Sequence, residues 1–444
     1  MKKIALILDN KNRDLDGICL IAKCLTDAGY KIAVIPYNLM QFELYLQDFD
    51  FVLFNFIRNY NHSLVREITS ANIPAGVSDT EGGVFVDIKS FFDTWPENVD
   101  KIKNFYYFFW GKELCEFALK NALLEPVQAY VTGCPRFDVY AKFGEKYASE
   151  ILEDGGYVLF NTNYPLASPK FNSVQKELTQ SKISPSQYDR FCSYREIQLK
   201  ERDAVVNLIN YITQKVDIKI IVRPHPFEDG QFYEEAFAAN RFVKVNSEGT
   251  VKDIIQNASL VVQRGCSTGF ETRLLGKKSL SPNWMPFQHS TLVDEGNIFF
   301  ENKDALLSYI INHTDDQHKS IDENTKQHID KYFYKIDGNS SYRVASHIAN
   351  IIRGSERQFF LKKFKIKSLI KRILYYFVGF SEVSFLRSYY REIDLWKKSG
   401  KYFNAQDIKE KCDHLGIALD INEPTKSRMS KFQRCAIQIT GAKV

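Results

Sequence analysis

The sequence lacks the patterns that identify several common classes of protein. Its eight cysteines include no CxxC pair, which argues against a zinc site or a disulfide framework and favours reduced thiols in a cytoplasm. No stretch approaches the roughly 20 consecutive apolar residues that are needed to span a bilayer. The apolar run at residues 4–8 is interrupted at Asp9, so we expect a β-strand there rather than a signal peptide.

The positive charge is small in total but concentrated towards the end of the sequence. A formal net charge of +5 is too low to favour nucleic acid as a partner. Between Arg357 and Arg372, however, there are seven lysines or arginines and no acidic residue. Residues 357–380 combine these cations with aromatic residues at helical spacing, which favours an anionic membrane surface. A helix that packs against the first domain would show similar spacing.

Alternating strand-like and helix-like segments predict two α/β domains. The sequence begins with a strand–helix–strand unit, and the alternation restarts after Gly155 and Gly156. We therefore expect Rossmann-like domains at residues 1–150 and 151–354, followed by a helical, basic and aromatic extension at 355–444. Two doubly wound domains that face a cleft would be the GT-B arrangement, although the alternation equally fits other two-domain α/β proteins.

Two apolar runs in the second domain end at residues that can bind an anion. One is followed by Arg223 and by His225, which lies between two prolines, and the other leads into residues 265–271. The second segment would start a helix whose N–H groups and dipole favour a phosphate. His225 could bind or protonate a leaving phosphate. The other candidates for nucleotide binding are Arg223, Ser267, Thr268, Gly269 and Glu271, with Asn161 and Asn163 at a neighbouring strand end.

The same two segments have simpler structural explanations and exclude some ligands. The histidine could cap a strand end, and Ser267 and Thr268 could cap the helix. The second segment lacks the glycine spacing of a dinucleotide fingerprint and the lysine of a P-loop, which argues against NAD and ATP. We expect no metal or other cofactor, because His225, basic side chains and the helix dipole would neutralise the phosphate.

The first domain carries carboxylates at its strand ends. Glu81 lies in a glycine-rich bend, and Asp138 follows another strand end, two residues after Arg136. A carboxylate in such a position suits a nucleophile or general base at an anomeric carbon; a solvated turn or an ion pair between Arg136 and Asp138 is the structural alternative. The loop after the first strand would contact hydroxyl groups of a substrate or cap the first helix, through Asn10, Arg13 and Asp14.

These segments together resemble bacterial surface-carbohydrate biosynthesis proteins in their order and spacing. They are residues 9–14, 79–83, 133–138, 161–163, 223–226 and 266–271. Within that group the sequence is most similar to the retaining β-Kdo transferases of capsule and O-antigen assembly. The similarity extends over residues 1–350 and leaves out the C-terminal extension.

The resemblance implies a GT-B glycosyltransferase that moves Kdo from CMP-Kdo to a glycan or lipid-linked oligosaccharide. The first domain would bind this acceptor and the second the nucleotide donor. His225, Ser267 and Thr268 would hold the CMP phosphate, and Glu271 would hold the nucleotide. Arg136 would neutralise the Kdo carboxylate. Asp138 is the first choice for the nucleophile and Glu81 the second, with the other as acid or base.

Such an enzyme would be cytoplasmic and peripheral to the inner membrane.

Two alternative functions stay open. A His-Pro motif with a following Ser/Thr segment also occurs in sialyltransferases and in polyol-phosphate transferases that use CDP-glycerol, so the donor could be another nucleotide-activated group. A non-catalytic assembly protein at the membrane, attached through its basic segment, belongs to a different class.

Overall fold

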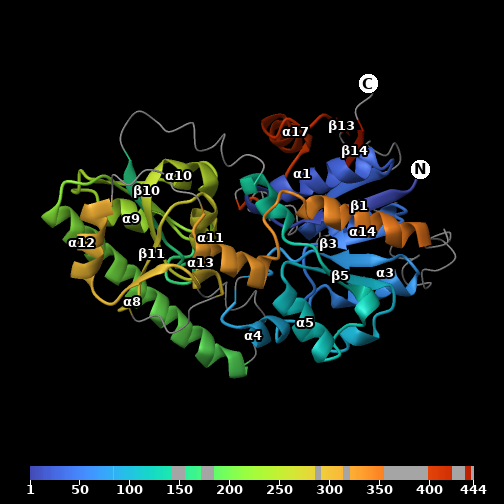
Figure 1. Cartoon of the computed structure of the whole chain (residues 1–444), viewed down its shortest axis with the longest axis horizontal. Coiled ribbons are helices and arrows are strands. Elements are labelled where there is room, and N and C mark those ends of the chain that lie inside the picture. Colours follow the sequence, from blue (N-terminus) through green and yellow to red (C-terminus); the bar gives the residue numbers. More distant parts are fainter. Residues whose placement is uncertain are drawn as a thin grey trace, which may run out of the picture. The chain divides into compact units, whose positions relative to one another are not determined.

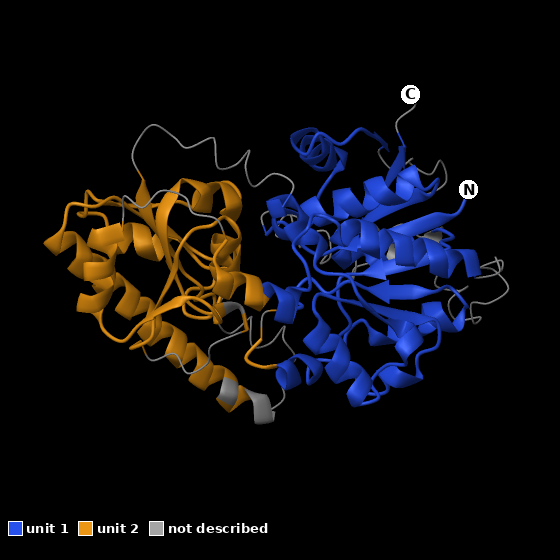
Figure 2. Ribbon diagram, in the orientation of Figure 1, with its two compact units in different colours: residues 1–82, 88–142, 329–444 blue, residues 83–87, 143–328 orange. Residues whose placement is uncertain are grey.

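The structure is a computed structural model in which the chain forms two compact units (Figures 1 and 2). Unit 1 comprises Met1–Gly82, Ile88–Lys142 and Ile329–Val444, and unit 2 comprises Gly83–Asp87 and Phe143–His328. The residues described are 1–83, 85–141, 156–171, 185–285, 292–313, 321–354, 399–422 and 436–441.

Unit 1 is built on an eight-stranded sheet in the order β13-β14-β2-β1-β3-β4-β5-β6. The six strands from β2 to β6 in this order are parallel, whereas β14 is antiparallel to both β2 and β13. The strands are β1 (Lys3–Leu8), β2 (Lys31–Pro36), β3 (Phe51–Phe54), β4 (Ala75–Val77), β5 (Phe105–Phe109), β6 (Ala129–Val131), β13 (Leu419–Asn422) and β14 (Ile437–Gly441).

The central strands of unit 1 form because they are continuous apolar runs that are covered on both faces. Five of the six residues of β1 are buried, and all four of β3. Helix α1 packs against α14 on one face, and α3 and α5 lie on the other (Figure 1). The helices are α1 (Lys11–Asp27), α2 (Met40–Leu46), α3 (His62–Ser70), α4 (Ile88–Phe92), α5 (Lys112–Lys120), α14 (Ser340–Gly354) and α17 (Ala405–His414).

Unit 2 contains a six-stranded parallel sheet in the order β12-β11-β10-β7-β8-β9. Its strands are β7 (Tyr157–Asn161), β8 (Ile220–Arg223), β9 (Val243–Val245), β10 (Ala258–Gln263), β11 (Ser279–Pro282) and β12 (Ile298–Phe300). Its helices are α8 (Pro185–Lys215), α9 (Gln231–Ala236), α10 (Val251–Asn257), α11 (Ser267–Leu274), α12 (Lys303–His313) and α13 (Glu323–His328). A single apolar core joins β7, β8 and β10 to α8 and α12. The expected α/β class with two doubly wound domains is confirmed.

The division of the chain differs from the predicted boundaries in three places. The boundary expected after residue 150 lies after Lys142. The second unit ends at His328 rather than at residue 354. The chain then returns to unit 1, because the apolar face of α14, including Val344, Ile348 and Ile352, is buried there against α1. Residues 83–87 belong to unit 2, although the first domain was expected to be continuous up to residue 150.

The C-terminal extension is helical only in part. It contributes α17, but it also adds β13 and β14 to the sheet of unit 1. Ile437 and Ile439 of β14 are fully buried beside β2. The basic segment 357–380, which was expected at a membrane surface, lies outside the described residues. Within the residues that are described, no helix has both the length and the apolar character to cross a membrane.

A chain that ends at Gly354 should therefore be less stable than the full chain. It loses β13, β14 and α17, exposes the edge of β2, and removes the Ala436 N–H that Glu43 accepts at 3.2 Å. We expect a lower melting temperature by circular dichroism, and aggregation on heating. A chain that ends at Gly441 keeps both strands and is the control; equal melting temperatures for the two shortened chains would contradict the prediction.

Candidate active site

In unit 1, Arg13 joins two loops at the carboxyl ends of β1 and β4. Its guanidinium donates to Asp14 at 2.8 and 3.0 Å, to Asp9 at 3.2 Å, to Thr80 at 3.0 Å and to Glu81 at 3.0 Å. We call these five residues the Arg13 cluster. The carboxyl ends of parallel strands share one edge of a sheet, which explains why loops about 70 residues apart in sequence meet here. The structure thus brings together three predicted residues, Arg13, Asp14 and Glu81.

The bend that carries Glu81 is held by Asp79. This carboxylate is buried, and it accepts the N–H of Glu81 at 2.9 Å, a guanidinium N–H of Arg58 at 3.1 Å and the hydroxyl of Tyr107 at 2.9 Å. Burial raises the pKa of Asp79, and the charge of Arg58 opposes that effect. Asp79 belongs to the segment 79–83 that the sequence analysis singled out. Its role as the support of the bend also depends on Arg58 and Tyr107, which lie outside every motif.

Accessibility separates the carboxylates of this region. The side chain of Glu81 is 56% exposed, whereas those of Asp9, Asp14 and Asp79 are 12%, 6% and 1% exposed. Burial raises the pKa of Asp9, although Lys401 and Arg13 lower it. Burial also disfavours the charge of Arg13, but the carboxylates of Asp14, Glu81 and Asp9 outweigh burial and raise its pKa. Glu81 is therefore the carboxylate of this region that is most open to a ligand.

The C-terminal extension reaches the same loop. The Lys401 ammonium lies 3.7 Å from Asp9, and the carbonyl of Gly400 accepts the N–H of Lys11 at 2.8 Å. Asn10, which was expected to contact a substrate, caps α1 by accepting the N–H of Asn12 at 2.9 Å and donates to the carbonyl of Ser399 at 3.0 Å. Asn10 is buried, so its role is structural.

Asp138, the first choice for the nucleophile, has a different role in the structure. Its side chain is only 1% exposed, and its two oxygens accept the N–H groups of Ser340 at 2.9 Å and Ser341 at 2.7 Å. The two carboxylate oxygens therefore accept the free N–H groups in the first turn of α14, where the helix dipole also favours a negative charge. This corrects the prediction, because a buried carboxylate that caps a helix is not presented to a sugar.

Arg136 is also buried, and its guanidinium lies over the rings of Phe137 and Trp110 at 4.7 and 5.7 Å. Gly17 of α1 permits the close approach of the backbone at Pro135 and Arg136, since a Cβ atom there would lie 2.9 Å from the backbone nitrogen of Arg136. Arg136 lines a small cavity of about 40 Å³ together with Asp14 and Asp79. It thus belongs to the same region as the Arg13 cluster but faces the interior.

In unit 2, the loop that follows β7 connects the two predicted anion-binding segments. The side-chain amide of Asn161 donates to the Thr268 hydroxyl at 3.1 Å, and that of Asn163 donates to the carbonyl of Gly265 at 3.4 Å. Both bonds attach the loop to the start of α11. Ser267 donates to Glu271 at 3.0 Å within the first turn of that helix. Asn161, Asn163, Ser267, Thr268 and Glu271 are therefore neighbours.

Glu228 attaches the same loop to the His225 segment. This buried carboxylate accepts the hydroxyls of Thr162 at 2.7 Å and Tyr233 at 2.6 Å, and the N–H groups of Tyr164 and His225, both at 3.2 Å. Burial raises its pKa, while these hydrogen bonds oppose the shift. Glu228 was not among the residues predicted from the sequence. Its position three residues after His225, in a segment of mostly apolar and turn-forming residues, could have indicated a supporting role.

The orientation of His225 follows from its contact with the backbone. Its Nδ1 accepts the N–H of Phe227 at 3.2 Å, so the neutral ring carries its proton on Nε2. The side chain is half-buried at the carboxyl end of β8. A histidine in this tautomer can donate a hydrogen bond to a phosphate oxygen through Nε2.

Two other residues that were predicted to bind the nucleotide make structural contacts in unit 2. Arg223 donates to the carbonyls of Glu248 and Gly249 at 2.7 and 2.8 Å, and it is 9% exposed; it holds the loop before α10 instead of a nucleotide. Burial lowers its pKa. Gly269 is needed for packing, because a Cβ atom there would lie 2.2 Å from the Gln263 amide nitrogen. Across the described residues, no group of three or more His, Cys, Asp or Glu could hold a metal ion.

Comparison with known proteins bears on the fold. No family model and no curated protein matches the chain. Among solved structures, a candidate UDP-N-acetylglucosamine 2-epimerase from Listeria monocytogenes matches with a TM-score of 0.51 and 12% identity, over 81% of this chain and 99% of the other. The UDP-GlcNAc 2-epimerase of Methanocaldococcus jannaschii, in complex with UDP-GlcNAc and UDP, gives 0.50 and 15% over 78% and 99%. MnaA from S. aureus with UDP gives 0.50 and 14% over 81% and 100%.

The chain has the GT-B fold. Its two units with parallel sheets and its match to nearly the whole length of these structures support this assignment. At 12–15% identity the likeness concerns the fold alone, and the reaction has to be argued from this chain's own residues.

The capping role of Asp138 predicts a loss of stability when it is replaced. Asp138→Ala removes both acceptors of the α14 N-terminus and should lower the free energy of unfolding by about 2–3 kcal/mol. Asp337→Ala, which removes an exposed ion pair with Arg343 in the same unit, should cost about 1 kcal/mol or less. Urea unfolding measures both; equal losses would contradict the assignment.

Behind the Gly265 segment, a buried ion pair predicts a pH-dependent stability. Glu201 lies 3.7 Å from Arg264, which also donates to the carbonyls of Pro282 and Met285. Burial raises the pKa of Glu201 from 4.5 to about 7, although Arg264 opposes the shift. The folded state then holds this proton more tightly than the unfolded state, so the stability from Glu201 is lost as the pH rises through about 7.

Between about pH 5 and about pH 8, Glu201 should lower the free energy of unfolding by roughly 3 kcal/mol at most. Glu201→Gln should remove this part of the pH dependence, because the amide does not titrate. Urea unfolding of both proteins at the two pH values tests the prediction, and an unchanged pH dependence in the variant would refute it.

Proposed function

We propose that the protein is a glycosyltransferase of bacterial surface-glycan synthesis, with a nucleotide sugar as its donor. The observation that carries the proposal is the arrangement in unit 2, where Glu228 and the loop after β7 hold His225 and the start of α11 at the carboxyl ends of β8 and β10, the two strands that flank β7. A hydrogen-bond donor on His225 and the N-terminus of an eight-residue helix both favour a phosphate.

The donor that we propose is CMP-Kdo. His225 and Ser267 would bind the phosphate that leaves with the nucleotide, and Glu271 would accept hydrogen bonds from ribose hydroxyls. The resemblance of the motif segments, such as residues 79–83 and 223–226, to those of β-Kdo transferases supports this choice of sugar. The likeness to structures that contain UDP or UDP-GlcNAc is compatible with a nucleotide sugar, and it does not select the base.

Transfer with retention requires a carboxylate nucleophile, and we propose Glu81 for that role. It replaces Asp138, whose oxygens cap α14. Glu81 is exposed, and it is oriented by Arg13 through its side chain and by Asp79 through its backbone N–H. In a retaining reaction the carboxylate attacks the anomeric carbon as the bond to the nucleotide phosphate breaks. The acceptor oxygen then bonds to that carbon as the ester to the carboxylate breaks, and the acceptor hydroxyl gives its proton to a general base.

The acceptor that we propose is a glycan or lipid-linked oligosaccharide at the cytoplasmic side of the inner membrane. The basic segment 357–380 would supply the attraction to anionic lipid. A CDP-glycerol-dependent transferase would share His225 and Ser267, but it transfers a phosphoryl group and has no use for a carboxylate nucleophile. The exposed and supported Glu81 therefore favours glycosyl transfer over that alternative, and over a non-catalytic assembly protein.

A donor screen with the full chain tests the proposal. We expect release of CMP from CMP-Kdo, and little or no nucleotide release from CDP-glycerol or UDP-GlcNAc, measured by chromatography. Glu81→Gln and His225→Ala should each lower the rate by roughly 100-fold or more, because one removes the nucleophile and the other a donor to the leaving phosphate.

Matched controls are Asp93→Asn, an exposed carboxylate of unit 1 paired with Lys89, and His313→Ala, a half-buried histidine of unit 2. Both should keep the wild-type rate. Mass spectrometry after incubation with CMP-Kdo should find a Kdo adduct on the peptide that contains Glu81. Release only from another donor would overturn CMP-Kdo, and an adduct on a different carboxylate would overturn Glu81.

A further inference from the structure

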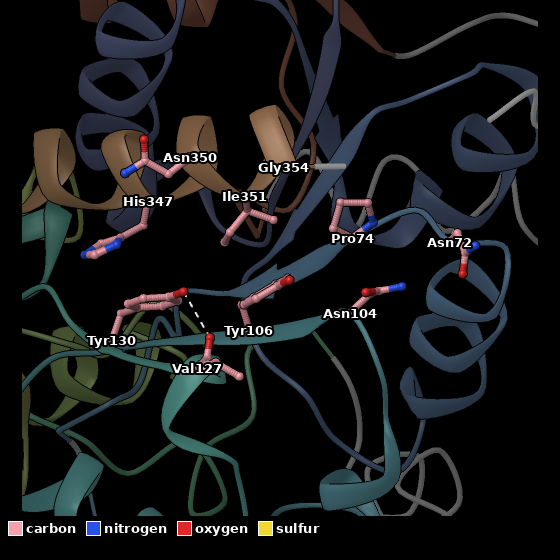
Figure 3. Close-up of a pocket in the computed structure, with 10 residues that line it drawn as sticks. All are labelled: Asn72, Pro74, Asn104, Tyr106, Val127, Tyr130, His347, Asn350, Ile351 and Gly354. Carbon is pink, nitrogen blue, oxygen red and sulfur yellow. Dashed lines mark hydrogen bonds between the residues drawn. The ribbon is translucent and has the colours of Figure 1, made fainter. Parts of the chain in front are cut away.

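Unit 1 also has a groove, at the edge of its sheet opposite to the Arg13 cluster. It measures about 630 Å³ and lies at the amino ends of β4, β5 and β6, beneath the last turns of α14 (Figure 3). Asn72 precedes β4 and Asn104 precedes β5, whereas the Arg13 cluster follows the carboxyl ends of β1 and β4. The groove is thus separate from the candidate active site, and its volume is in the range of small-molecule pockets.

Aromatic rings form one side of this groove. The ring centroids of Tyr106 and Tyr130 are 6.3 Å apart at an angle of 29°, and those of Tyr130 and His347 are 4.2 Å apart at 30°. Figure 3 shows His347 and Ile351 extending from α14 towards these two tyrosines. The Tyr130 hydroxyl donates to the carbonyl of Val127 at 3.0 Å, which fixes the ring as a half-buried platform.

Side-chain amides form the polar part of the groove. Asn72, Asn104 and Asn350 are exposed, and their amides make no hydrogen bond within the part of the chain that the structure describes. Asn72 and Asn104 have φ angles of 56°, a conformation that asparagine tolerates, so backbone geometry alone explains two of the three. Asn350 lies in regular helix, and no such geometry explains it.

The groove contains no charged side chain among the ten residues that line it. Burial lowers the pKa of His347, so this ring is neutral near pH 7. Among these ten lining residues, a phosphate or a sugar acid would find no counter-ion. Neutral sugars fit the lining, because their C–H faces pack on aromatic rings and their hydroxyls pair with amides that both donate and accept.

We propose that this groove binds a neutral oligosaccharide, as a second contact for the glycan that the enzyme extends. The chemistry of the lining stands by itself, and only the source of the sugar rests on the proposed function. A long acceptor held away from the reacting end gains affinity through two linked contacts. A proline-rich peptide could also pack on tyrosines, but it has little use for three amides that can pair with hydroxyls.

Binding to the full chain without donor tests the proposal. Maltohexaose, mannohexaose and chitohexaose are titrated at millimolar concentration and followed by saturation-transfer NMR. We expect at least one of them to bind. Tyr106→Ala and Tyr130→Ala should weaken that binding by roughly five- to tenfold, and Tyr130→Phe, which keeps the ring, should retain it.

Tyr342→Ala is the matched control, because Tyr342 lies on the same helix, is 63% exposed and does not line the groove. It should bind like the wild type, and melting temperatures verify that each variant is folded. Absence of binding by all three sugars, equal weakening by Tyr342→Ala, or binding of a polyproline peptide in place of sugar would each overturn the proposal. A chain that binds sugar but releases no nucleotide would contradict the proposed function and leave the groove standing.

Discussion

The carboxylate of Glu228 accepts four hydrogen bonds, two from the loop after β7, one from the His225 segment and one from Tyr233 of α9, and it thereby connects these segments of unit 2. A buried charge is costly unless donors surround it, and the donors here are two hydroxyls and two backbone N–H groups. Satisfying Glu228 therefore fixes the loop after β7 relative to the His225 segment. Asn161 and Asn163 extend the same connection to α11.

In unit 1, Asp79 and Asp138 are likewise buried carboxylates whose oxygens accept several hydrogen bonds. Asp79 is satisfied by the bend that carries Glu81, and Asp138 by the first turn of α14. This sorts the acids of the motifs by role. Those whose oxygens accept backbone N–H groups position the loops, whereas Glu81 is exposed beside Arg13 and is the carboxylate that we propose as the nucleophile. The glycosyl-transfer proposal thus rests on the carboxylate of Glu81 in one unit and on the proposed phosphate site in the other.

The C-terminal extension is part of unit 1. Its strand β14 continues the sheet beyond β2, and residues 399–401 contact Asp9, Asn10 and Lys11, just before Arg13 in α1. Lys401 adds a cation close to Asp9, in a region that already contains Arg13 among several carboxylates. A segment that the family resemblance leaves out therefore contributes to the electrostatics of the candidate active site.

The sequence by itself determined the two α/β domains, because long apolar β-branched runs alternate with helical periodicity and can be buried only as covered parallel strands. It also located the strand ends that meet in each unit, including Arg13, Glu81, His225 and Ser267. The return of α14 to unit 1, and the roles of Asp138, Arg223 and Asn10, were decided only by tertiary structure. Motif chemistry states which atoms can accept or donate, whereas the partner that satisfies a buried group often comes from far along the chain. Ser340 lies 202 residues after Asp138, and Ser399 lies 389 after Asn10.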